Sequence, residues 1–176
     1  VAAPRAELNM SETVSILKPP AKNPATSPEL SDALRGAVEE KRGQVLARLC
    51  EAVTEFGAQG LTFANSLGAE DIVLTDLILS EALPIEIFSL DTGRLPPETY
   101  ALIGEVGKRY QPRLKIFFPD TAAVESWVRE HGINAFYDSV ELRRACCGIR
   151  KVEPLRRALA GKRAWITGLR AAQSAT

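Results

Sequence analysis

The sequence predicts an α/β fold, a doubly wound and mostly parallel sheet with helices on both faces. Short apolar runs at residues 61–64, 85–90, 114–118 and 164–167 have the length of strands, and stretches with helical spacing of apolar residues separate them. Strands that alternate with helices are typical of parallel sheets, which bind ligands at the carboxyl ends of their strands. The chain has 176 residues, of which 45% are hydrophobic, so it is long enough for one core and too short for two sizeable domains.

Helical periodicity is clearest before the first strand and between the others. Apolar residues at three- and four-residue steps predict one helix, or two short ones, over residues 31–56, with interruptions at Gly36 and Gly43. Cys50 stands beside Leu49 on this apolar stripe and is predicted to be a small buried side chain. Further helices are predicted from near Ala69 to Leu79 and over residues 98–110, 121–131 and 151–159, whereas residues 132–144 are predicted to be irregular or weakly helical.

Composition restricts the classes of partner. Lys plus Arg and Asp plus Glu balance at 22 each, so nucleic acid is not expected and any anion site must come from local placement of basic residues. No apolar run could span a bilayer and the amino terminus lacks the order of a secretion signal, so we expect a cytoplasmic protein without a membrane partner. Residues 1–30 contain five prolines and no sustained periodicity, and are predicted to be a disordered tail before a domain over residues 31–176.

The stretch from Leu61 to Asp71 runs from a predicted strand through a Ser/Gly turn into a helix. Ser66 and Gly68 would let backbone N–H groups converge at the amino end of that helix, where unpaired amides and the helix dipole favour an anion. A simpler interpretation is a capped helix, with Ser66 as the N-cap and Glu70 and Asp71 in the first turn.

Two more loops follow predicted strands and should meet this turn at the same edge of the sheet. They are Asp91-Thr92-Gly93-Arg94 and Gly168-Leu169-Arg170. Arg94 and Arg170 would then clamp an anion held near Ser66, an arrangement that suits a nucleotide. The chain has no Gly-x-Gly-x-x-Gly and no Gly-Lys-Ser/Thr, so neither a dinucleotide fingerprint nor an ATPase P-loop is present.

Cys146 and Cys147 are adjacent and are followed by Arg150 and Lys151. Nearby positive charge lowers a thiol pKa and favours the thiolate, so ligation of an iron–sulfur cluster or of zinc is one interpretation, and two small buried residues is the other. Three cysteines, two of them adjacent, do not form a disulfide framework and indicate a reducing compartment.

Together these motifs resemble the assimilatory sulfonucleotide reductases over about residues 60–176. The motifs that carry the resemblance are Ser66-Leu-Gly-Ala-Glu-Asp71, Leu90-Asp-Thr-Gly-Arg-Leu95 with Pro97-Glu-Thr-Tyr100, Cys146-Cys-Gly-Ile-Arg-Lys-Val-Glu-Pro-Leu155, and Gly168-Leu-Arg170 with Gln173-Ser174. The cysteine pair resembles the iron–sulfur branch, which reduces adenylyl sulfate, and not the cluster-free branch, which reduces 3′-phosphoadenylyl sulfate.

The resemblance implies an adenine-nucleotide alpha-hydrolase-like fold and the thioredoxin-dependent reduction of adenylyl sulfate to sulfite and AMP in sulfate assimilation. Thioredoxin or glutaredoxin would be the reductant, and the protein could be a homo-oligomer. Cys146 and Cys147 would supply two of the four ligands of a 4Fe–4S cluster, with Lys151 between the cluster and the sulfonate. The substrate-binding residues implied are Ser66, Gly68, Ser89, Leu90, Asp91, Thr92, Arg94, Lys151, Gly168 and Arg170.

Three departures from the family pattern stand out. The family usually has His where Pro96 stands and Arg where Ala171 stands, so anion contacts there are expected to be weaker. The family also continues past position 176 with further arginines, a Cys-x-x-Cys that completes the cluster, and a nucleophilic cysteine near the carboxyl terminus. We therefore expect this chain to correspond to the first two thirds of such a reductase and to be inactive by itself.

Two other classes of function explain part of the sequence. Ser66, Asp120 and His131 occur in the chain order of an α/β-hydrolase triad, with Ser66 in a turn that resembles a nucleophile elbow. A non-catalytic adenine-nucleotide-binding module would keep the Ser66 turn without a nucleophile. The hydrolase interpretation does not need the cysteine pair or Lys151.

Overall fold

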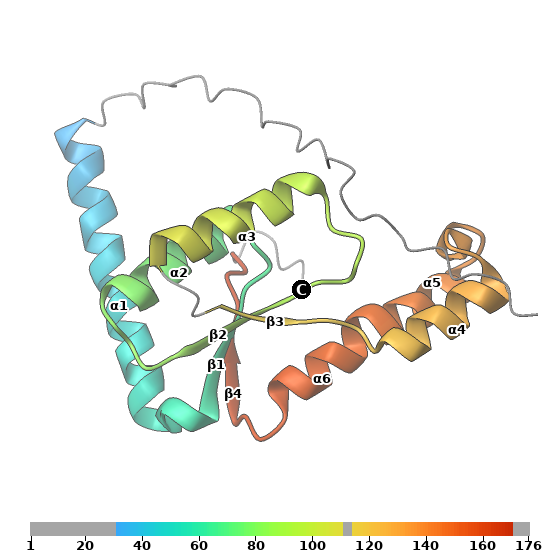
Figure 1. The fold of residues 1–176 in the computed structure, drawn as a ribbon. Helices are drawn as coiled ribbons and strands as arrows, with labels where there is room; N and C mark the ends of the chain where they lie inside the picture. Colours follow the sequence, from blue (N-terminus) through green and yellow to red (C-terminus); the bar gives the residue numbers. More distant parts are fainter. Residues whose placement is uncertain (1–30, 111–113, 171–176) are drawn as a thin grey trace, which may run out of the picture.

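The structure is a computed structural model, which describes residues 31–110 and 114–170. Its sheet has four parallel strands in the order β3-β2-β1-β4 (Figure 1). The strands are β1 Leu61–Ala64, β2 Glu86–Leu90, β3 Leu114–Phe117 and β4 Ala164–Ile166. Phe63 of β1 is in register with Ile87 on one side and Ile166 on the other. The strand order reverses beside β1, a point at which parallel α/β sheets bind ligands.

Six helices accompany the sheet in the described residues. They are α1 Asp32–Gly60, α2 Ala69–Ser80, α3 Pro97–Tyr110, α4 Thr121–His131, α5 Val140–Cys147 and α6 Glu153–Leu159, with a short 3₁₀ turn at Ala135–Tyr137 and a π-helical turn at Gly148–Val152. Helices α2 and α3 lie on one side of the sheet and α6 on the other, while α4 and α5 extend beyond α6 (Figure 1). The predicted parallel α/β fold is confirmed.

Apolar side chains from the strands and from helices α1 and α2 form the main core. Phe63, Ile78 and Ile87 are at most 1% exposed, and Leu49 of α1 and Leu77 of α2 pack with them. Each such side chain stabilises the fold by about 1.5–3 kcal/mol through burial. A second, smaller cluster joins Trp127, Ala135 and Cys146 near the outer end of α4. The fold therefore has one core at the sheet and a second, smaller one that includes Cys146.

The strand predictions agree with the structure to within one residue at each end, but the prediction for Cys50 was wrong. Cys50 is exposed, because only the face of α1 that carries Leu49 meets the core. Leu34 and Val38, on the same apolar stripe, are 48% and 52% exposed because this half of α1 extends past the sheet. Residues 132–144, predicted to be irregular or weakly helical, contain the 3₁₀ turn and the start of helix α5. The Ser139 hydroxyl caps α5 by accepting from the Leu142 amide at 3.1 Å.

Two further sequence predictions can be compared only in part. The predicted tail over residues 1–30 lies outside the described residues, as does Ala171. In the part of the chain that the structure describes, no helix is both long and apolar enough to cross a membrane.

Candidate functional site

A cavity of about 580 Å³ opens at the carboxyl ends of β1, β2 and β4, a volume typical of small-molecule sites. Seven of the ten predicted substrate-binding residues line it, namely Ser66, Gly68, Ser89, Leu90, Thr92, Lys151 and Gly168. Asp91, Arg94 and Arg170 are not among the lining residues. Because parallel strands end at one edge of a sheet, three loops far apart in the sequence form the walls of one cavity.

Side-chain hydrogen bonds fix the loop between β1 and α2. The Asp71 carboxylate accepts from both the amide and the hydroxyl of Ser66, each at 2.6 Å. The Asn65 side chain accepts from the Leu67 amide at 2.6 Å and donates to Thr75 at 2.7 Å. Leu67 has a φ of 65°, a left-handed conformation that costs about 1–2 kcal/mol in a residue with a side chain. These side-chain bonds hold the loop in that conformation.

Helix α2 begins at Ala69, as predicted, but its N-cap is Gly68, which makes no side-chain capping bond. The prediction of Ser66 as the N-cap was wrong, because Asp71 engages the Ser66 hydroxyl. The amides at the start of a helix have no acceptors within that helix, and they favour an anion. The backbone at the amino end of α2, and not the Ser66 side chain, is therefore the part of this wall that suits an anion.

Gly168 brings the loop after β4 against the first turn of α2. A Cβ atom at this position would lie 2.1 Å from Asp71 Oδ1 and 3.1 Å from the Asp71 amide nitrogen. No side chain fits there without moving one of the two elements. Glycine at 168 thus allows the β1 and β4 loops to close the same cavity.

The loop after β2 is organised by its own side chains. Asp91 Oδ1 accepts from the Gly93 amide at 2.7 Å and from the Tyr100 hydroxyl at 2.9 Å. The bond to Asp91 raises the pKa of Tyr100, with burial as a smaller cause. Asp91 is buried and holds the conformation of this loop without lining the cavity, whereas Thr92 lines it.

The two predicted arginine clamps point elsewhere. Arg94 donates to the carbonyl of Ile133 at 3.1 Å and to the side chain of Asn134 at 2.9 Å, and lies over the ring of Phe136. Arg170 forms an ion pair with Glu70, with 2.7 Å between Nε and Oε1. Among the described residues, Lys151 is therefore the one cationic side chain that lines the cavity.

Several residues that line the cavity were not among the predicted substrate-binding residues. Leu95 and Thr99 follow the β2 loop, Leu155 comes from α6, and Trp165 and Thr167 come from β4 and its end. Trp165 is 48% exposed although it lies in a strand. The sequence did contain a signal for Trp165, because this aromatic residue closely precedes the predicted site loop Gly168-Leu169-Arg170.

The cysteine pair ends helix α5. Cys146 is 7% exposed and packs in the cluster with Trp127, whereas Cys147 is exposed, and both are free thiols. The indole N–H of Trp127 is buried and has no hydrogen-bond partner among the described residues. No group of three or more candidate metal ligands occurs within residues 31–110 and 114–170. Two thiols are the right donor type for an iron–sulfur cluster, and Cys146 and Cys147 would supply half of the four ligands that it needs.

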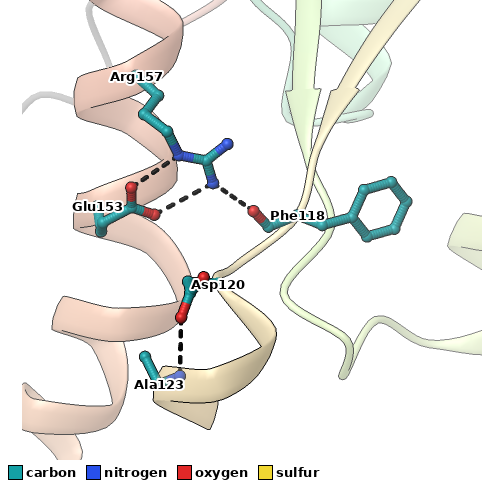
Figure 2. A network of polar contacts seen from close by, with 5 residues as sticks. All are labelled: Phe118, Asp120, Ala123, Glu153 and Arg157. Carbon is teal, nitrogen blue, oxygen red and sulfur yellow. Dashed lines mark hydrogen bonds and ion pairs between the residues drawn. The ribbon is translucent and has the colours of Figure 1, made fainter.

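The predicted hydrolase triad does not assemble. Asp120 caps α4 by accepting from the Ala123 amide at 2.8 Å (Figure 2). His131 ends the same helix of 11 residues, about 16 Å away, and packs against Trp127. Because Ser66 is bonded to Asp71, the three side chains share no site.

A larger groove, of about 1160 Å³, lies between α1, α2 and α3. Apolar residues such as Val38 and Val73 line it, and several of its charged residues are ion-paired, including Arg109 with Asp76. It shares no lining residue with the cavity at the strand ends and contains none of the predicted site residues. We therefore assign the functional site to the smaller cavity.

The fold and the cavity define a parallel α/β domain with a ligand site at the carboxyl ends of its strands. Residues 60–176 match the phosphoadenosine phosphosulfate reductase domain. The chain belongs to this family, which confirms the resemblance found in the sequence.

Known proteins similar to the chain include two named adenosine 5'-phosphosulfate reductase. The Allochromatium vinosum protein is 48% identical over 149 residues, covering 85% of this chain and 56% of that protein. The Burkholderia cepacia protein is 49% identical over 149 residues, covering 84% and 60%. The chain thus spans somewhat over half the length of these relatives. A crystal structure of phosphoadenylyl-sulfate (PAPS) reductase from Candida auris, a phosphate complex, aligns with a TM-score of 0.62 at 28% identity, covering 84% of this chain and 72% of that one.

Proposed function

We propose that this domain binds adenylyl sulfate as part of a reductase that converts it to sulfite and AMP in sulfate assimilation. The observation that carries the proposal is a single cation, Lys151, in a cavity that also contains the amino end of α2. A helix amino end and a lysine together suit the two anionic groups of a phosphosulfate. The names of the relatives at 48% and 49% identity support the same substrate.

The walls of the cavity suggest separate roles along the nucleotide. Lys151 would bind the sulfonate, and the start of α2 at Gly68 would bind the phosphate. The adenosine would lie along Ser89, Leu90 and Gly168, with Trp165 and Leu155 supplying apolar contact. Asp91, Arg94 and Arg170 would act indirectly, by shaping the loops that hold these groups.

In the reaction that we propose, a cysteine thiolate of the whole protein attacks the sulfur of adenylyl sulfate. The bond from sulfur to the phosphate oxygen breaks, AMP leaves, and the sulfonate remains on the cysteine. A dithiol reductant, thioredoxin or glutaredoxin, then releases sulfite and becomes a disulfide. Positive charge at the sulfonate, supplied here by Lys151, reduces the repulsion between the thiolate and the anion in the transition state.

Cys146 and Cys147 fit a 4Fe–4S cluster as two of its four ligands. Both are free thiols. The buried indole N–H of Trp127, which has no hydrogen-bond partner in the part of the chain that the structure describes, lies in the same cluster of side chains as Cys146. When bound, such a cluster can exchange electrons at a potential set by hydrogen bonds to its sulfurs and by solvent exposure. We further propose that the protein is cytoplasmic, because free cysteines suit a reducing compartment, and that it is a homo-oligomer.

Two alternatives rest on specific observations. A 3′-phosphoadenylyl-sulfate substrate is favoured by the family description and by the name of the Candida auris protein. A non-catalytic nucleotide-binding module is favoured because none of the three cysteines lines the cavity. The cysteine pair supports the adenylyl-sulfate reductase over both.

Sulfite release by the complete protein distinguishes these functions. We expect release from adenylyl sulfate with thioredoxin, and much slower release from 3′-phosphoadenylyl sulfate. Measuring sulfite release again with glutaredoxin in place of thioredoxin identifies the reductant. The opposite order of substrates would support the first alternative, and nucleotide binding without sulfite release would support the second.

A further inference from the structure

Arg150 is a buried cation whose one identified hydrogen bond is to a backbone carbonyl. Its side chain is 9% exposed, and one terminal nitrogen donates to the carbonyl of Thr92 at 2.7 Å. In the part of the chain that the structure describes, no carboxylate forms an ion pair with it. Buried arginines are normally paired, because removing the charge from water is costly. A purely stabilising role would therefore be served better by an apolar residue or by an ion pair.

The loop after β2 is shaped to receive this guanidinium. Gly93 has a φ of 70°, and a Cβ atom there would lie 3.3 Å from the Arg150 nitrogen. Asp91 accepts from the amide of Gly93, and the Thr92 hydroxyl accepts from the amide of Arg94 at 3.2 Å. These turns direct the Thr92 carbonyl to Arg150 and leave room for its side chain.

Arg150 joins two walls of the cavity. It lies in the π-helical turn Gly148–Val152, directly before Lys151, and its bond crosses 58 residues of sequence to the β2 loop. Thr92 and Lys151 both line the cavity, whereas Arg150 does not. π-helical turns are uncommon and occur often at functional sites.

From this arrangement we infer that Arg150 is a positioning residue, which fixes the Lys151 ammonium relative to the nucleotide-binding loop through the Thr92 carbonyl. The inference rests on the proposed function, since it assigns Lys151 to the sulfonate. Without this bond the turn that carries Lys151 is no longer tied to the loop, and the cation loses its fixed distance from the nucleotide.

A double-mutant cycle on equilibrium binding tests the inference. The measured quantity is the Kd of AMP divided by the Kd of adenylyl sulfate, for the wild type, Arg150→Met, Lys151→Ala and the double variant. We expect each single change to lower this ratio about tenfold, because one charge-assisted contact is lost. The ratio for the double variant should be less than about twofold below the ratio for Lys151→Ala, since Arg150 acts through Lys151.

Arg157 provides a matched control. It also donates to a backbone carbonyl of a distant element, that of Phe118 after β3, and it pairs with Glu153 (Figure 2). Arg157 lies outside the cavity. Arg157→Met should lower the melting temperature and leave the ratio of Kd values unchanged. Arg150→Lys, which keeps a charged donor, should restore most of the ratio.

The outcomes separate the inference from the proposed function. A lower melting temperature for Arg150→Met with an unchanged ratio, or fully multiplicative effects with Lys151→Ala, would overturn the inference alone. A wild-type ratio near one would overturn the proposed function and the inference with it. Should Arg150→Met not fold, Arg150→Gln keeps a shorter N–H donor, and the same ratio is measured with it.

Discussion

One oxygen of Asp71, Oδ2, accepts two hydrogen bonds from Ser66, at 2.6 Å from its amide nitrogen and 2.6 Å from its hydroxyl. The other oxygen faces Gly168. Asp71 thus ties together the β1 loop, the first turn of α2 and the end of β4. It also places a carboxylate in the wall of a cavity to which we assign an anionic ligand.

Asp71→Asn should change stability and anion affinity in opposite directions. Loss of the charge-assisted bonds to Ser66 should lower the free energy of unfolding by about 1–3 kcal/mol. Removal of a negative charge from the cavity wall should tighten the binding of inorganic phosphate and AMP. Urea unfolding and calorimetric titration measure the two effects. Asp76→Asn, on the outer side of α2 where Asp76 pairs with Arg109, is the control and should leave phosphate affinity unchanged.

Gly168→Ala should be strongly destabilising, because the new Cβ would overlap Asp71. We expect a loss of about 1–3 kcal/mol, typical of a steric insertion into a packed site, together with weaker nucleotide binding. Gly107→Ala in α3 is the matched control, since a Cβ there meets no atom within 4 Å and Ala favours helix by about 1 kcal/mol. Equal melting temperatures for the two variants would contradict the close contact between Gly168 and Asp71.

The three thiols should differ in reactivity in metal-free protein. Cys50 and Cys147 are exposed and Cys146 is buried, so an aromatic disulfide reagent should modify two thiols quickly and one slowly. In the complete protein, Cys146→Ser and Cys147→Ser should each remove the iron, while Cys50→Ser should leave the iron content unchanged. Loss of iron on changing Cys50 would show that the ligands have been assigned to the wrong cysteines.

Glu86 should give part of the stability a dependence on pH. A hydrogen bond from Lys115 lowers the pKa of Glu86 below its ordinary value of 4.5, against a smaller effect of burial, and Lys162 lies nearby. A lowered pKa in the folded state adds stability above about pH 4.5, and this is lost as the pH falls through the lowered value. Glu86→Gln should therefore cost up to about 1 kcal/mol at pH 7 and almost nothing near pH 2. A cost that is the same at both pH values would rule out the ionic origin.

Much of the fold followed from the sequence because its signals are local. The strands at 61–64 and 86–90 are short apolar runs with clear ends, and parallel pairing brings the loops after them to one edge. Six predicted residues met in the cavity for this reason, and the seventh, Lys151, comes from the π-helical turn before α6. Periodicity was a weaker guide at Cys50, since a stripe shows which side of a helix is apolar but not how far the helix extends past the core.

Side-chain direction was the part that the sequence could not provide. The position of Arg94 after β2 places its backbone at the correct edge, but the guanidinium turns to carbonyl and amide oxygens 39 and 40 residues later in the chain. Those partners, Ile133 and Asn134, precede α5 in a region that was predicted only to be irregular or weakly helical. The bond between Arg150 and Thr92 depends on the same kind of long-range contact.

Lys151 provides the most direct test of the central claim, which is that the cavity binds adenylyl sulfate with its sulfonate at this lysine. Calorimetric titration would give the Kd values of adenylyl sulfate and AMP for the wild type, Lys151→Ala and a control, Lys108→Ala, whose ammonium pairs with Glu105 on α3. We predict that Lys151→Ala weakens the binding of adenylyl sulfate about ten- to hundredfold and the binding of AMP less than about twofold. The reason is that a charge-assisted contact contributes about 1.5–3 kcal/mol and that AMP lacks the sulfonate. Lys108→Ala should change neither affinity. Equal losses for both nucleotides in Lys151→Ala would contradict the account.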